Sequence, residues 1–388
     1  MPPRTRDYIF YDTAVSLCST CYARVDAKIL FAGERVILSK HCPEHGPERV
    51  LVADDIEYWR RARELFLKPS EQPLRPHTAT HFGCPYDCGL CPDHEQHSCV
   101  TLIEVCDHCN LECPICFSSS GPHRPEFRSL ENIERMLDVV VASEGEPDVV
   151  QISGGEPTLH PEFFAILDAA RARPIRHLML NTNGLRIAAE PEFAARLAQY
   201  MPAFEVYLQF DSLEADPLAR LRGKDLREVR RKALERLNEH GISTTLVVTV
   251  QRDVNDAELG AIVDFALTQP AVRGVTFQPV QHAGRSAGFD PEHDRLTLTE
   301  VRRRLLEQTD VFQPADIMPV PCHPDCIAMA YALKGDDGVL PLTGLIDPQV
   351  LINAGRNTIT YEHDEGLQAK LFAEPAIIEM MALYKETL

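Results

Sequence analysis

The stretch CNLECPIC, residues 109–116, decides how this chain is interpreted. Its cysteines Cys109, Cys113 and Cys116 form a C-x3-C-x2-C triplet, and three thiolates at this spacing can hold three irons of a [4Fe-4S] cluster. Because such a cluster is normally held by four cysteines, its fourth iron would stay open to another ligand. The alternatives are part of a structural zinc site and an electron-transfer cluster, with Cys106 as a fourth thiol nearby.

A second motif, SGGEPTLHPE at Ser153–Glu162, follows a strand-like run further along the chain. The backbone of Gly154 and Gly155 can approach a ligand closely, Glu156 can accept from a cationic ammonium, and Pro157 fixes the exit of the turn. Together the two motifs resemble the radical S-adenosylmethionine (SAM) superfamily. This resemblance implies a cluster whose open iron chelates the amino and carboxylate groups of SAM.

The segment 101–295 alternates strand-like and helical patterns, which predicts an α/β fold with a parallel sheet and helices on one face. The expected strands are Leu102–Val105, Val149–Ser153, His177–Asn181, Glu205–Phe210, Thr244–Val250 and Gly274–Pro279. The expected helices are Ser129–Ala142, Pro161–Ala172, Pro191–Tyr200, Leu226–His240 and Asp256–Thr268, followed by one capped by Thr299. The resemblance implies that the sheet is an open, partial (β/α)6 barrel. In parallel β/α folds the reactive site lies at the carboxyl ends of the strands.

The resemblance also implies a set of residues that contact SAM at these strand ends. Glu156 and the backbone of Gly154 and Gly155 would meet its ammonium group. Asn183 would meet the ribose hydroxyls or the carboxylate of SAM, and Gln209 and Asp211 would face the same side of the site. Ile115 and Gln278 would flank the adenine, and Arg222 would meet a carboxylate. Polar residues at strand ends also often cap loops, and that alternative stays open. No side chain is assigned as a catalytic residue beyond the cluster ligands.

Residues 1–68 are typical of a small zinc-ribbon or rubredoxin-like module. Cys18-x2-Cys21 and Cys42-x2-His45 flank two β-rich stretches that read as a hairpin. Together these four side chains would complete a tetrahedral site for zinc or a mononuclear iron. The alternative makes His45 an ordinary turn residue beside an incomplete site.

Residues 69–100 carry a second cysteine cluster. Cys84, Cys88, Cys91 and Cys99 are spaced C-x3-C-x2-C-x7-C, and four thiolates suffice for an auxiliary [4Fe-4S] cluster. Zinc is the alternative, because it takes the same number of ligands.

The remaining segment, 296–388, is interpreted as a C-terminal extension. Its Cys322-x3-Cys326 pair repeats the spacing of the first two ligands in both cluster loops. We expect the pair to ligate a further cluster, with Cys106, His323 or a substrate atom completing it. The alternative is a pair of ordinary buried thiols, since a cysteine without a partner behaves as a small hydrophobe.

Composition narrows the functional classes. The 388 residues carry a formal net charge of −19, which argues against nucleic-acid binding because phosphate backbones need a basic footprint. No apolar run is long enough to span a membrane, and the N-terminus lacks a signal-peptide core. The 13 cysteines occur in short clusters, which favours metal ligation over disulfides. We therefore expect a cytoplasmic protein.

The full arrangement of motifs, over residues 15–330, resembles the family that includes archaeal tetraether lipid synthase and the pterin-methylating radical SAM enzymes. Cys106 departs from the threonine common there, and the chain is shorter at its C-terminal side than larger members. The resemblance implies reductive cleavage of SAM to a 5′-deoxyadenosyl radical, which abstracts hydrogen from an unactivated carbon.

Two substrates are compatible with that chemistry. We expect C–C bond formation on a lipid, which would associate the protein with a membrane, and the alternative is C-methylation of a pterin. Both need an electron donor such as flavodoxin or ferredoxin. A hypothesis of another class is a non-catalytic iron–sulfur electron carrier or scaffold, although a carrier would need no SAM motif.

Overall fold

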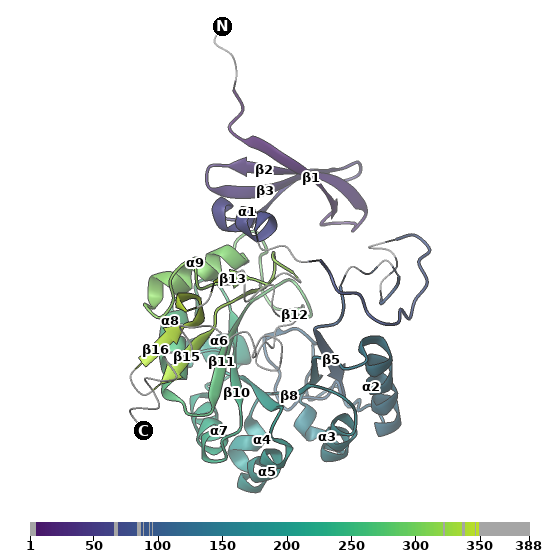
Figure 1. The fold of residues 1–388 in the computed structure, drawn as a ribbon, viewed down its shortest axis with the longest axis vertical. Helices are drawn as coiled ribbons and strands as arrows, with labels where there is room; N and C mark the ends of the chain where they lie inside the picture. The colour runs from purple at the N-terminus through teal and green to yellow at the C-terminus, as the bar shows by residue number, and fades with distance from the viewer. Residues whose placement is uncertain are drawn as a thin grey trace.

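The computed structural model describes residues 5–65, 69–83, 87, 89–92, 94, 96–320, 323–335, 338–345 and 347–348. Cys84, Cys88 and Cys322 lie outside these residues, as do residues 349–388 of the C-terminal extension. Figure 1 shows an N-terminal sheet above a larger body that contains a second sheet with helices packed on it. The two parts correspond to the expected metal module and barrel.

The N-terminal module is an antiparallel sheet in the order β1-β2-β3-β4, formed by Ile9–Leu17, Arg24–Ala32, Arg35–Cys42 and Gly46–Ala53. The expected hairpin is β2–β3, and its turn contains Gly33 at a φ of 61°, a conformation that favours glycine. Strands β1 and β4 were not expected. Helix α1 (Ile56–Glu64) follows, with the side chain of Asp55 accepting from Tyr58 N at its N-terminus.

All six expected strands form one parallel sheet. They are β5 (Val100–Glu104), β7 (Val149–Ser153), β8 (His177–Thr182), β9 (Phe204–Gln209), β10 (Thr244–Val250) and β11 (Val272–Pro279). The order β11-β10-β9-β8-β7-β5 follows the chain without crossing, and every pair is parallel. The open (β/α)6 arrangement is therefore confirmed.

Helices cover one face of this sheet (Figure 1). They are α2 (Leu130–Glu144), α3 (Phe163–Arg171), α4 (Leu185–Ala189), α5 (Pro191–Leu197), α6 (Ala215–Arg222), α7 (Arg227–Glu239), α8 (Leu259–Thr268) and α9 (Leu298–Gln308). The five expected barrel helices are present, while the short α4 and α6 were not expected. The cap of helix α9 lies two residues earlier than predicted, because Thr297 and Glu300 form a reciprocal capping box and Thr299 lies inside the helix.

The sheet has two chemically different faces. Alternate residues of its strands pack with the helices in one hydrophobic core that includes Val150, Ile152, Leu178, Leu180, Val206, Leu208, Leu246 and Val248. Because successive strand side chains point to opposite faces, the residues between them lie on the other face, inside the barrel. We call this side the inner face.

Short elements complete the described structure: the strands β6 (Ile115–Cys116), β12 (Arg285–Ser286), β13 (Met318–Pro319), β14 (Ala328–Met329), β15 (Ala332–Gly335) and β16 (Gly338–Pro341), and the 3-10 turns η1 (Pro157–Leu159), η2 (Ala198–Tyr200) and η3 (Leu342–Gly344). None of the helices in the described part of the chain is long and apolar enough to cross a membrane.

The N-terminal module docks on the barrel through α9. Asp54 N donates to Thr299 Oγ1 at 2.9 Å, and Arg302 pairs with Asp55 at 3.4 Å. Arg302 also lies over the ring of Tyr58, 4.5 Å from its centre. Figure 1 shows α1 between the N-terminal sheet and α9. The module is therefore fixed to the barrel by polar contacts.

Candidate functional site

The three-cysteine loop follows β5, at the carboxyl end of the sheet. Cys109 and Cys113 are buried and Cys116 is half-buried, and the first two pack with Leu111 and Leu226. Burial raises the pKa of Cys109 to about 12 and also raises the pKa of Cys113. Thiols desolvated in this way become thiolates readily only beside positive charge, which a bound metal supplies. The chemistry of the loop therefore fits an iron–sulfur cluster.

An arginine beyond the last barrel strand holds this loop in place. Arg285 donates from Nε to Cys113 O at 2.6 Å and from Nη2 to Ser120 O at 2.9 Å. Strand β12, which contains Arg285, pairs with β6 of the cluster loop. A side chain on the neighbouring Gly284 would collide with the carbonyl oxygens of Cys116 and Phe117. The sequence analysis did not predict these contacts of Arg285. The only signal for them was the HAGRSAG stretch after the sixth strand.

The Gly-Gly-Glu-Pro turn packs directly against the same loop. Gly155 N donates to Cys106 O and Glu156 N donates to His108 O, both at 2.8 Å. Side chains on Gly154 or Gly155 would collide with those carbonyls, and Gly154 has a φ of 127°. The glycines thus allow close approach between two backbone segments of the protein, beyond the expected approach to a ligand. Pro157 begins the 3-10 turn η1 as the motif predicts.

The structure gives Glu156 a role that differs from the expected one. Its carboxylate is 1% exposed and accepts from Thr158 N at 3.1 Å, Thr158 Oγ1 at 2.6 Å, Thr182 Oγ1 at 2.7 Å and Asn183 N at 2.8 Å. Four internal donors occupy the carboxylate, so it joins the ends of β7 and β8 and is not presented to an ammonium group. The backbone groups of Gly154 and Gly155 are therefore the part of this motif that suits contact with SAM.

Asn183 connects the end of β8 to the cluster loop. Its Nδ2 donates to Asn110 Oδ1 at 2.8 Å and lies 3.9 Å from Cys109 Sγ, while its Oδ1 accepts from Leu185 N at 3.0 Å. These contacts place Asn183 beside the three-cysteine loop, and its expected contact with SAM stays a prediction. The contact with Leu185 N also ties Asn183 to the first residue of the short helix α4.

Asp211 and Arg222, both expected to contact SAM, form a buried ion pair with each other. Arg222 donates to the two Asp211 oxygens at 2.7 and 2.6 Å, and to Ile115 O at 3.2 Å. Gln209 Nε2 donates to Asp211 Oδ1 at 2.7 Å. Burial alone would raise the pKa of Asp211, but the Arg222 guanidinium holds it below its ordinary value. The carboxylate that Arg222 contacts is thus that of Asp211, within the protein. Through the bond from Arg222 to Ile115 O, the pair also supports the three-cysteine loop.

Gln278 lies at the exposed end of β11 and donates to the hydroxyl oxygen of Tyr207 at 3.0 Å. Both side chains lie on the inner face of the sheet. Tyr207 was not predicted as a site residue, although its alternation with Glu205 and Gln209 in β9 was the available signal.

The ribbon site is the best-defined metal site in the described structure. Ligand atoms of Cys18, Cys21, Cys42 and His45 all lie within 4.8 Å of one another. Cys42 Sγ is 3.5 Å from His45 Nδ1 and 3.8 Å from Cys21 Sγ. Backbone N–H groups, first those of Cys21 and Glu44, hold the pKa values of Cys18 and Cys42 below their ordinary value. Three convergent thiols and one imidazole fit a tetrahedral ion.

The second cysteine segment is anchored to the end of α2. Leu74 N donates to Ser143 O at 2.6 Å, and Glu144 accepts from Ser98 N and pairs with His97, both at 3.1 Å. Cys91 is buried and Cys99 is half-buried in this segment. With Cys84 and Cys88 outside the described residues, the four-cysteine cluster stays a prediction.

The third cysteine pair is also only partly described. Cys326 is exposed, and the neighbouring Asp325 pairs with Arg63 of α1. Cys106 is 1% exposed in the barrel core, and its thiol donates to His108 O and Glu156 O, both at 3.5 Å. These contacts give Cys106 a packing role, which favours a structural thiol over a ligand to a further cluster.

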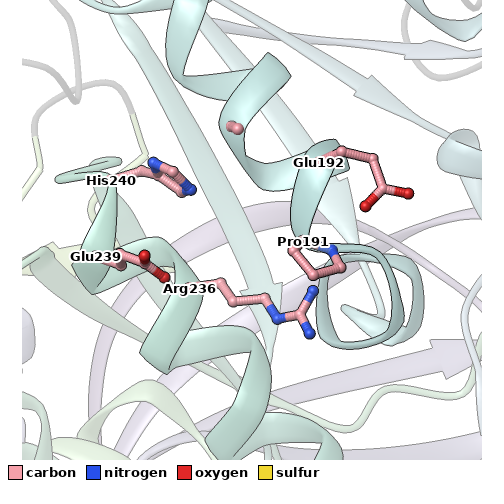
Figure 2. A pocket seen from close by; sticks show the side chains of 6 residues that line it. Pro191, Glu192, Arg236, Glu239 and His240 are labelled. Atoms are coloured by element: carbon pink, nitrogen blue, oxygen red, sulfur yellow. The ribbon is translucent and has the colours of Figure 1, made fainter.

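A surface pocket of 410 Å³ lies between α5 and the C-terminal end of α7 (Figure 2). It is lined by Pro191, Glu192, Ala195, Arg236, Glu239 and His240. None of the residues predicted for the site lines it, and it lies on the helix-covered side of the sheet. It is therefore separate from the candidate site.

A parallel partial barrel with a three-cysteine loop and a Gly-Gly-Glu-Pro turn at its carboxyl edge defines a radical SAM enzyme. The radical SAM superfamily model matches residues 103–266, and the model of the HMPTM N-terminal zinc ribbon domain matches residues 10–54. The 7,8-dihydro-6-hydroxymethylpterin dimethyltransferase of Methanocaldococcus jannaschii is 31% identical over 360 residues, covering 86% of this chain and 70% of that protein. The chain belongs to the radical SAM family that contains this dimethyltransferase.

More distant similarities cover only parts of the molecule. Mycofactocin maturase of Mycolicibacterium smegmatis is 30% identical over 54% of this chain and 50% of its own length. The crystal structure of SuiB from Streptococcus suis with its precursor peptide aligns with a TM-score of 0.46 and 17% identity, over 54% of this chain and 45% of that one.

Proposed function

We propose that this chain is a radical SAM C-methyltransferase acting on a pterin, which was the alternative to lipid coupling in the sequence interpretation. The similarity to a pterin dimethyltransferase supports this substrate class. No comparison reported above supports the lipid reading. The observation that carries the proposal is the polarity of the inner face of the barrel.

Hydrogen-bonding side chains dominate that face. Strands β7 to β11 place there Gln151, Ser153, Asn181, Glu205, Tyr207, Gln209, Thr245, Thr249, Thr276 and Gln278. The apolar residues on this face, with β5 included, are Val100, Leu102, Val149, Met179 and Val247. A binding site for lipid tails would need continuous apolar lining, because each buried polar group without a partner costs free energy. A heterocycle with several N–H and carbonyl groups matches this lining.

The residues at the carboxyl edge would hold the cofactors. Cys109, Cys113 and Cys116 would ligate the cluster, and backbone groups of Gly154 and Gly155, with Asn183, would meet SAM. When bound, cluster and SAM together supply a 5′-deoxyadenosyl radical that abstracts hydrogen from the substrate. The chain's own residues bind and orient the reactants and exclude water. Ile115, Gln209 and Gln278 stay proposed SAM contacts, whereas Asp211, Arg222 and Glu156 fix the loops around them.

The other metal sites complete the proposal. Cys18, Cys21, Cys42 and His45 would bind zinc, consistent with the match to a zinc ribbon. Cys84, Cys88, Cys91 and Cys99 would hold an auxiliary cluster that accepts electrons from a flavodoxin or ferredoxin. Cys322 and Cys326 are candidate ligands of a further cluster. We place the protein in the cytoplasm.

The test follows hydrogen from the substrate into the cofactor product. Protein purified without oxygen is reduced and incubated with SAM and 6-hydroxymethyl-7,8-dihydropterin deuterated at its ring and side-chain carbons. We expect deuterium in 5′-deoxyadenosine by mass spectrometry. SAM cleavage without deuterium transfer would contradict a pterin substrate, and deuterium transfer only from isoprenoid lipid would restore the lipid reading. No SAM cleavage at all would favour a carrier or scaffold.

A further inference from the structure

Two buried glutamate–histidine pairs occur among the residues that the structure describes, and they differ in one respect. Glu144 pairs with His97, and Glu205 pairs with His177, each at 3.1 Å. Glu144 uses its second oxygen as well, because Oε1 accepts from Ser98 N at 3.1 Å. Glu205 Oε1 is buried and has no hydrogen-bond partner among the residues that the structure describes.

A buried acceptor without a donor needs an explanation. Glu205 is 8% exposed, and leaving one of its oxygens unsatisfied costs free energy that the matched pair at Glu144 does not bear. The first pair fastens a surface segment to α2, so its role is structural. The second pair has retained an acceptor that the fold does not use, which points to a ligand.

The position of Glu205 places that acceptor on the inner face. Its neighbours Phe204 and Val206 pack into the helix-side core, so the side chain of Glu205 lies on the opposite side of the sheet. The strand register sets it in a row with Met179 of β8 and Gln151 of β7. Gln209 at the carboxyl edge lies four positions further along β9, which is about 13 Å along a strand.

We propose that Glu205 is a specificity-determining residue whose carboxylate accepts from the N–H groups of the 2-amino-4-oxopyrimidine edge of a pterin. This inference rests on the proposed function. His177 holds one carboxylate oxygen and so directs the other, while a carboxylate has acceptor capacity for two N–H groups. Bound with this edge at Glu205, the pterin directs its opposite ring toward the carboxyl edge of the sheet, where the cluster loop lies.

The residues in the row with Glu205 suit both the apolar faces and the polar edge of a flat heterocycle. Met179 provides a polarizable apolar side chain beside the carboxylate, and Gln151, 6% exposed, adds an amide with both donor and acceptor groups. A ligand with a carbonyl in place of the amino group would set an oxygen against the carboxylate. A site built to accept from N–H groups therefore rejects that analogue.

The test compares two ligands that differ at this edge. Equilibrium dialysis of the cluster-loaded, SAM-bound protein measures the dissociation constants of 6-hydroxymethylpterin and of 6-hydroxymethyllumazine, which carries a carbonyl where the pterin has its amino group. We expect the wild type to prefer the pterin by at least about tenfold. Glu205→Gln should weaken that preference and Glu205→Met should abolish it.

Glu144→Gln is the matched control, because it alters an equally buried glutamate–histidine pair whose two oxygens are both satisfied. Its preference for the pterin should equal that of the wild type. An unchanged preference in Glu205→Met, with pterin binding retained, would overturn the role of Glu205 and leave the proposed function standing. Failure of the wild type to bind either ligand would overturn the proposed function itself, and the inference with it.

Discussion

The ribbon site and the three-cysteine loop are both built from thiols, but they are completed in different ways. In the ribbon, three cysteines and His45 converge so that all four donor atoms lie within 4.8 Å of one another. In the barrel, the loop supplies three thiols, and its neighbours Arg222 and Arg285 donate to backbone carbonyls of the loop. The first set is complete in itself, whereas the second offers three thiols among the residues that the structure describes.

This difference separates a structural site from a reactive one. Structural metal sites are closed by four protein ligands, while catalytic sites keep one position for a substrate. The surroundings follow the same division, since the ribbon site lies in a small two-layer module and the loop lies at the carboxyl edge of a large parallel sheet. The number of protein ligands therefore predicts what each site does.

The largest expected effect is on SAM cleavage, and it comes from removing the three cysteines of the barrel loop. Changing Cys109, Cys113 and Cys116 together to Ala should abolish formation of 5′-deoxyadenosine from SAM, because no iron would then be held with an open position. Product analysis after reduction with dithionite measures this. Iron analysis of the same variant should still detect the auxiliary cluster. Full SAM cleavage by the triple variant would break the distinction between the two sites.

Removing one ligand of the ribbon site should affect folding more than catalysis. Cys42→Ser should release the ribbon metal and unfold the N-terminal module, because a module this small depends on its ion for stability. Metal analysis by mass spectrometry and hydrogen exchange of the strands β1 to β4 follow these changes. Protection of these strands equal to that of the wild type, with the metal gone, would show that the site is dispensable for folding.

The support beneath the reactive loop should carry a large share of stability. Asp211→Asn leaves Arg222 buried without its anionic partner, which should destabilise the protein by about 3–5 kcal/mol in urea unfolding. Asn tolerates the positive φ of 71° at this position, so the change isolates the charge.

The same pair predicts a pH dependence. Because the folded pKa of Asp211 lies below its unfolded value, the stabilisation is present at neutral pH and is lost as pH falls through the folded pKa. The wild-type curve of unfolding free energy against pH should contain this component, and the Asp211→Asn curve should not. Parallel curves for the two proteins in the acid range would contradict the assignment.

The smallest effect is expected at the junction between the two regions. Thr299→Val keeps the shape of the side chain but removes the acceptor for Asp54 N, which should cost about 1 kcal/mol. Thermal unfolding measures the loss. A matched change at exposed Thr268, whose hydroxyl contacts only its own helix end and Gln269, should cost less. Equal losses would argue against coupling through Thr299.

The sequence was sufficient for the parts of the fold that rest on local pattern. Apolar runs and their spacing located all six barrel strands, and the Cys-x2-Cys and Cys-x2-His pairs located the ribbon ligands. The flanking strands β1 and β4 were missed because only Ala53 among their residues is buried, so neither has a clear apolar face. The cap of α9 was misplaced by two residues because Thr297 and Thr299 are equivalent by type, and only the position of Glu300 separates them.

Side-chain roles were less accessible, because they depend on contacts between distant segments. Glu156 was expected to meet SAM, and no local pattern reveals that Thr182 and Asn183 of the next strand end occupy its carboxylate. Arg285 lies 172 residues from Cys113, so its hold on the cluster loop is a property of the folded barrel. The unsatisfied oxygen of Glu205 likewise becomes visible only when its neighbours are in place.

Electron–nuclear double resonance with isotopically labelled SAM tests the central distinction most directly. The reduced protein is examined with SAM carrying 15N in its amino group and 17O in its carboxylate, and with cobalt in place of the ribbon metal. We expect both labels to couple to the cluster of the Cys109–Cys116 loop and the cobalt spectrum to stay unchanged by SAM. Absence of coupling at the cluster, or a SAM-dependent change at the cobalt, would contradict the account of one open and one closed site.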